Sequence, residues 1–147
     1  MRGDRRGDEM KADLVLVALH VAANMVWVGA LLASVLVVVA KGGPVAGQAR
    51  LGRTIYARLA VPAFVLSFLL GAARLGMDWR LYLVTTHFMH AKLALAFVAI
   101  VAHHWIGALL NRLTDERATA GRMLKGMAYV FAIACLGSVV LVVMRPF

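Results

Sequence analysis

The sequence predicts an all-α protein, an integral membrane bundle of four transmembrane helices with histidines inside it. Hydrophobic residues make up 63% of its 147 residues, whereas soluble domains average about 45–50%. They gather in long uncharged blocks, which include residues 14–40, 93–111 and 126–144. Because a helix needs about 20 apolar residues to cross a bilayer, each block is about long enough for one span. The four helices would form one domain over residues 13–147.

The first helix is expected over residues 13–40, after a polar N-terminal tail at residues 1–12. The tail contains several basic residues, as a signal peptide does. The apolar block that follows is much longer than the ~7–15 residues of a signal-peptide core, so we expect the helix to be retained. Glycines and a proline end it at residues 42–44, since both residue types stop helices. Residues 41–53 are expected to form a basic loop.

The second helix is expected over residues 54–76, with Arg58 and Arg74 near its two ends. Long basic side chains at helix ends can reach the lipid headgroups. Pro62 falls in the first turns of this helix, where proline is tolerated best. The third and fourth helices are expected over residues 81–111 and 122–144.

The net charge of +9 comes from basic residues that lie between the apolar blocks. This distribution indicates contact with membrane lipid headgroups rather than with nucleic acid. The loops after the first and third helices are slightly more basic than the opposite side, which weakly favours a cytoplasmic location for them. The single cysteine, Cys135, excludes an internal disulfide and a zinc motif.

All five histidines fall in predicted helices, where ionisable residues are costly and therefore suggest function. On the first helix, His20, Asn24, Trp27 and Ser34 share one face. We expect this face to point into the bundle. The alternative is a polar seam that only forms hydrogen bonds between helices.

His20 and His90 lie at the same depth, about 10–14 Å from one membrane surface at 1.5 Å per residue. Two histidines at one depth on facing helices can hold a haem iron as axial ligands. His87, one turn shallower than His90, is a rival ligand. His103 and His104 lie ~21 Å further along the third helix and are explained equally well as interfacial aromatic residues.

Lys92 also lies inside the third helix, about 200° around the helix axis from His90. A lysine at this depth needs an anion, a polar cavity or a route to the surface. A porphyrin propionate would be a suitable anion. Arg58 and Tyr56 lie at the other end of the bundle and would suit lipid headgroups equally well. The eight methionines form no repeated copper-binding pattern.

Several short motifs resemble the HemJ-type protoporphyrinogen oxidases, in the same order and at similar spacing over residues 13–147. They are His20 with Trp27 and Gly29; Arg58 and Pro62 followed by Gly71; His90-Ala91-Lys92-Leu93 followed by His103-His104; and the ending Val-Val-Met-Arg-Pro-Phe.

The resemblance implies a haem b-binding protein of the inner membrane, with porphyrin-type substrates. Such a protein oxidises protoporphyrinogen IX to protoporphyrin IX in haem synthesis and passes electrons to an acceptor of the respiratory chain. His20 and His90 would be the iron ligands, with Trp27 and His87 beside the cofactor. Lys92, and with it Arg58, would be the catalytic residues.

Two family motifs are replaced in this chain. Gly126-Met127-Ala128-Tyr129 stands where the family has Asn-Glu-x-Pro, and Ser34-Val35-Leu36 replaces a Leu-Pro-Arg stretch. The differences concern the activity more than the fold. The chain is also similar to the copper-resistance D (CopD) family in its His…Trp-x-Gly pattern. A copper-handling protein with His and Met ligands and a non-enzymatic membrane subunit therefore stay as alternatives, and a homo-oligomer stays open.

Overall fold

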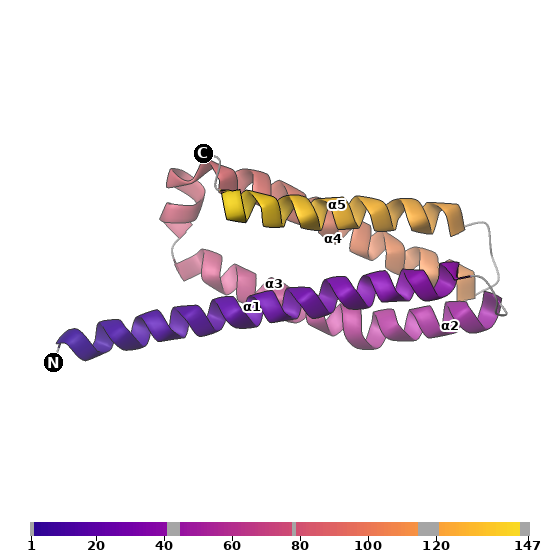
Figure 1. Ribbon diagram of the computed structural model, residues 1–147, viewed down its shortest axis with the longest axis horizontal. Helices are drawn as coiled ribbons and strands as arrows, with labels where there is room; N and C mark the ends of the chain where they lie inside the picture. Colours follow the sequence, from indigo (N-terminus) through magenta and orange to yellow (C-terminus); the bar gives the residue numbers. More distant parts are fainter. Residues whose placement is uncertain (1, 41–44, 78, 115–120, 145–147) are drawn as a thin grey trace.

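The computed structural model describes residues 2–40, 45–77, 79–114 and 121–144, all arranged around α-helices (Figure 1). The elements in chain order are α1 (Arg2–Val39), α2 (Val45–Ile55), the π-helical turn η1 (Tyr56–Ala60), α3 (Val61–Met77), the π-helical turn η2 (Leu81–Thr85), α4 (His87–Thr114) and α5 (Gly121–Met144).

Four helical segments are long and apolar enough to cross a membrane, and they confirm the predicted all-α bundle of four spans. The segments are Met10–Val39, Ala46–Met77, Phe88–Leu113 and Gly121–Met144. Many large apolar side chains are exposed along them, such as Val143 at 76%. Water would oppose so much exposed apolar surface, whereas lipid chains solvate it. The chain is a multi-pass membrane protein.

The bundle consists of two helix pairs (Figure 1). In one pair, α1 packs along α2, η1 and α3; in the other, α4 packs along α5. The pairs meet mainly where α2 contacts α4 and where α1 contacts α5. In the described chain, α1 and α4 do not pack closely against each other along their lengths, although Trp27 of α1 donates to His103 of α4.

The second span begins earlier than predicted, because residues 45–53 are helical rather than a loop. The segment is basic, but it is also amphipathic, and the small residues Ala49 and Gly52 form its buried face. Gly52 packs directly against α1, since a Cβ there would lie 2.6 Å from the Ser34 carbonyl oxygen. The predicted tail at residues 1–12 is also part of a helix, because α1 starts at Arg2.

Pro62 consequently lies within a continuous span. The sequence had placed it in the first turns of that span. Proline lacks an N–H group, and its ring collides with the carbonyl four residues earlier in a regular helix. The turn η1 lies directly before it, and the Val61 N–H donates to the Tyr56 carbonyl five residues back. This wider turn lets the helix continue past the proline.

The third span also differs from its predicted bounds, since it is interrupted near its start. The extended backbone of Thr86 separates η2 from α4. Its hydroxyl donates to the carbonyls of Leu81 and Tyr82, and its own carbonyl accepts the Met89 N–H. Thr86 therefore ends one helical segment and begins the next.

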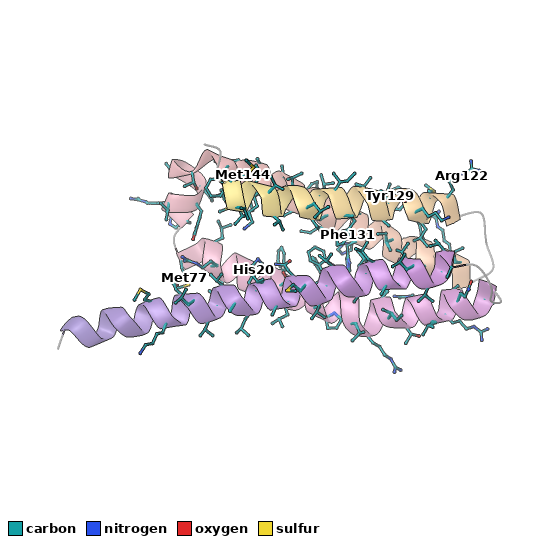
Figure 2. The ribbon with its side chains drawn as sticks, in the orientation of Figure 1. His20, Met77, Arg122, Tyr129, Phe131 and Met144 are labelled. Atoms are coloured by element: carbon teal, nitrogen blue, oxygen red, sulfur yellow. The ribbon has the colours of Figure 1, made fainter. Side chains whose placement is uncertain are left out.

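The packed core lies in the half of the bundle that holds the end of α1 and the start of α5. Its fully buried members include Leu31, Ile106, Leu110, Leu124 and Phe131. Phe131 lies between α5 and α1 (Figure 2). In the other half, described residues at 10–22, 68–77, 88–98 and 135–144 include only one buried side chain, Met89. The two helix pairs are therefore closely packed at one end and loosely packed at the other.

Candidate functional site

The polar face of α1 points toward α3 and α4 and runs from the loosely packed half into the core. Trp27 and Ser34 are buried, and His20 and Asn24 are half-buried. His20 lies on the side of α1 nearest α3 (Figure 2). The face therefore combines a polar cluster around His20 with an aromatic cluster around Trp27.

The His20 imidazole is fixed at both ring nitrogens. Nδ1 lies 2.9 Å from the Ser67 carbonyl oxygen, and because that oxygen can only accept, Nδ1 carries the proton. Nε2 then accepts a hydrogen bond from Asn24 Nδ2 at 3.0 Å. Asn24 is oriented in turn by the Ser67 hydroxyl, which donates to its Oδ1 at 2.9 Å. The His20 ring is neutral, with its lone pair on Nε2.

Gly71 on α3 makes room for this ring. A Cβ at position 71 would lie 2.9 Å from His20 Cε1, which is closer than side-chain contacts normally come. Ser67 and Gly71 are one helical turn apart on the same face of α3. Together they hold the edge of the imidazole and leave Nε2 directed toward Asn24.

Lys92 of α4 is half-buried, and its charge reaches His20. Among the residues that the structure describes, no carboxylate pairs with Lys92. Asp13, near the start of the first span, is 3.5 Å from the Arg74 guanidinium instead. The region therefore holds more positive than negative charge.

The other predicted site residues lie further from this cluster or outside the description. His90 is exposed, and its pairing with His20 across an iron stays a prediction. The His87 side chain lies outside the described residues. Arg58 is exposed on η1, beside the core half of the bundle, and is not brought together with His20 or Lys92.

His103 is not an interfacial residue, which was one of the two explanations that the sequence left open. It is 1% exposed, in the core. Trp27 Nε1 donates to its Nδ1 at 3.1 Å, so Nε2 carries the proton and donates to the Tyr56 hydroxyl at 3.3 Å. The Phe64 ring stacks on the imidazole at 4.8 Å. Since a tryptophan N–H cannot accept a proton, this network holds helices together and does not conduct protons.

Replacing His103 with phenylalanine should destabilise the protein. The ring size is retained, but the Trp27 N–H loses its acceptor and the Tyr56 hydroxyl loses its donor inside the core. A buried polar group left without a partner costs about 1–3 kcal/mol. Reversible unfolding in mixed detergents would measure the loss, with His104→Phe as the matched control because His104 is exposed. Equal stability of the two variants would show that the network contributes little.

Among the described residues, no group of three His, Cys, Asp or Glu side chains could surround a metal ion. Haem iron has a different requirement, because the porphyrin supplies most of its ligands and the protein adds one or two axial ones. His20 is suited to that role.

No known family model, curated protein or solved structure matches this chain. The residues around His20 are therefore the basis on which a function can be proposed.

Proposed function

We propose that this protein is a haem b-binding oxidoreductase of the inner membrane that acts on a porphyrinogen. One observation carries the proposal. His20 is held by a backbone carbonyl at Nδ1 and has its lone pair on Nε2, while Lys92 lies within electrostatic range and has no described carboxylate partner. A ring nitrogen with a lone pair and a lysine whose charge reaches that ring thus lie in membrane-spanning helices.

The His20 geometry fits an axial ligand. Histidines that bind metals usually donate their other ring N–H to a carbonyl or carboxylate, which fixes the tautomer and the ring plane. Ser67 supplies that carbonyl. The Nε2 lone pair is occupied only by the side-chain amide of Asn24, which a change of rotamer would remove.

The proposed ligands come from α1 and α4. These two helices meet in the core, where Trp27 donates to His103, and α1 otherwise packs mainly against α2, η1, α3 and α5. His90 of α4 stays the proposed second ligand, with Trp27 and His87 beside the cofactor.

Lys92 and Arg58 are the proposed catalytic residues. Lys92 would bind a carboxylate of the tetrapyrrole, since a charged hydrogen bond in a low-dielectric site orients a substrate strongly. Arg58 lies on another part of the bundle, so its proposed role is to bind an anionic group there. A bound haem supplies one-electron redox chemistry.

In the proposed reaction, protoporphyrinogen IX is oxidised to protoporphyrin IX. The electrons that it loses reduce an acceptor of the respiratory chain, and the protons pass to water. The residues of this chain bind and orient the substrate, and the membrane excludes water from the apolar macrocycle. The proposed partners are membrane lipid, the porphyrinogen and the electron acceptor.

The absorption spectrum of the detergent-purified protein tests the cofactor. We expect a Soret band and sharp bands on reduction. A protein that contains stoichiometric copper and no haem would contradict the proposal and support the CopD-like alternative. Rescue of a strain that lacks every protoporphyrinogen oxidase tests the activity. A well-expressed haem protein that fails to rescue would have another role.

Gly71→Ala should weaken haem binding without removing a ligand. The added Cβ displaces the His20 ring, and changes to groups that orient a ligand typically cost about 10–100-fold in metal affinity. We expect about a tenfold loss, measured by transfer of haem to apomyoglobin. Gly76→Ala on the same helix is the matched control, because its Cβ would meet nothing within 4 Å. Equal haem retention in both variants would contradict a role for the His20 ring position.

A further inference from the structure

Arg50 and Arg53 lie one helical turn apart on α2, at the end of the bundle where α2 and α5 begin (Figure 1). Arg50 is exposed and Arg53 is half-buried. Residues at this spacing are neighbours on a helix surface, where like charges repel each other. Within the part of the chain that the structure describes, neither arginine is in an ion pair. This pair of cations therefore needs an anion that the described chain does not supply.

Arg53 is held in place by an aromatic ring. Its guanidinium carbon lies 5.3 Å from the centre of the Tyr56 ring, which is a cation–π contact. Tyr56 is fixed in turn, because it is buried and its hydroxyl is hydrogen-bonded to His103. A side chain that is already ordered loses less conformational entropy when it binds a ligand. Arg53 is therefore the preorganised half of an anion site, and Arg50 is its exposed half.

Both arginines lie near the level of the lipid headgroups. The second span, Ala46–Met77, has 32 residues and is about 48 Å long at 1.5 Å per residue, whereas the hydrocarbon core is only ~30 Å thick. A span of this length reaches into the headgroup region. Arg50 and Arg53 are four and seven positions from its start, and from there their long side chains reach a lipid phosphate.

We infer that Arg50 and Arg53 together bind the phosphate of an anionic phospholipid. The planar guanidinium donates pairs of hydrogen bonds that match phosphate oxygens. Two positive charges favour a lipid of net negative charge, because they repel the ammonium group of a zwitterionic headgroup. The exposed Leu51 and Leu59 on the same span provide apolar contacts for the acyl chains, which a free phosphate ion would not use.

A lipid bound at this site should stabilise the closely packed half of the bundle. Arg53 of α2 is joined to α4 and α1 through Tyr56, His103 and Trp27. A ligand that binds only the folded protein raises the Tm in a concentration-dependent way. This effect does not depend on haem or on the proposed oxidase activity.

The helix α5 offers a matched control pair. Arg122 and Lys125 are also three positions apart and are both exposed, near the start of α5 at the same end of the bundle. In the described chain, no aromatic ring holds either of them. Removing these two charges changes the charge of this end as much as removing Arg50 and Arg53 does, but it leaves the preorganised site intact.

Thermal unfolding of the detergent-purified protein during titration with phosphatidylglycerol tests the inference. We expect a rise in Tm that saturates, and no comparable rise with phosphatidylcholine or inorganic phosphate. Arg50→Gln combined with Arg53→Gln should weaken the affinity for phosphatidylglycerol about 10–100-fold, because it removes hydrogen bonds between charged groups. Arg53→Lys, which keeps the charge but not the planar fork, should lose less. Arg122→Gln combined with Lys125→Gln should bind as the wild type does.

Equal affinity in the wild type and in the variant that lacks Arg50 and Arg53 would overturn the inference. Equal losses in the two double variants would also overturn it, because the lipid would then respond only to the overall charge of this end. An equal rise with phosphatidylcholine would contradict recognition of an anionic lipid, and an equal rise with inorganic phosphate would identify a site for a free anion. Absence of haem in the same preparation would contradict the proposed function alone, so the two failures are distinguishable.

Discussion

Replacing His20 with alanine is expected to yield a purified protein without bound haem. The variant lacks the imidazole that Ser67 and Asn24 hold in a single tautomer. His103 also contacts this face of α1, but Trp27 and Tyr56 occupy both of its ring nitrogens. The ratio of Soret to protein absorbance measures the loss. Added imidazole should restore part of the band, because the deleted side chain leaves a space of the same shape.

Two comparisons make the His20 experiment decisive. His104→Ala removes a histidine from the outside of the same bundle and should leave the haem content unchanged. His90→Ala tests the second ligand and should shift the bands of the bound haem toward a high-spin form. Wild-type spectra in both His20→Ala and His90→Ala would refute the proposed pair of ligands.

Lys92→Met is expected to lower oxidase activity about 10–100-fold while haem stays bound. The variant keeps an unbranched side chain of similar length but loses the charge that would bind a tetrapyrrole carboxylate. Hydrogen bonds to charged groups contribute about 1.5–3 kcal/mol, which corresponds to about 10–100-fold in activity. Growth of the oxidase-deficient strain, read beside the Soret band of the same variant, separates the two effects.

Lys92→Arg keeps the charge and should retain part of the activity. Lys125→Met is the matched control, since Lys125 is exposed on α5 and should tolerate the change. Full rescue by Lys92→Met would show that the half-buried lysine has a structural role only, and the assignment of the carboxylate contact would be wrong.

The four spans were predictable from the sequence because membrane insertion depends on the length and composition of apolar blocks. The helical character of residues 45–53 was not, because that segment is too polar to resemble a span. The small residues Ala49 and Gly52 are buried in it. Their spacing indicates a helix only when α1 is known to pack against this segment.

The candidate site was partly predictable for a related reason. His20, Asn24 and Trp27 share one face through helix geometry alone, and the structure places that face toward other helices. The partners Ser67 and Gly71 depend on how α3 is positioned against α1, which the sequence does not encode locally. His103 and His104 are adjacent, so one faces the core and the other faces outward, and only the packing of α4 decides which.

The π-helical turn before Pro62 has a consequence for the whole second span. It inserts one extra residue into a helix, and one residue corresponds to about 100° of rotation about the helix axis. Everything after the turn, including Ser67 and Gly71, is therefore rotated relative to α2. A deletion of a single residue between positions 56 and 60 would reverse this rotation of α3 relative to α2. It would turn the His20-binding face of α3 away from α1 while leaving the length and hydropathy of the span almost the same.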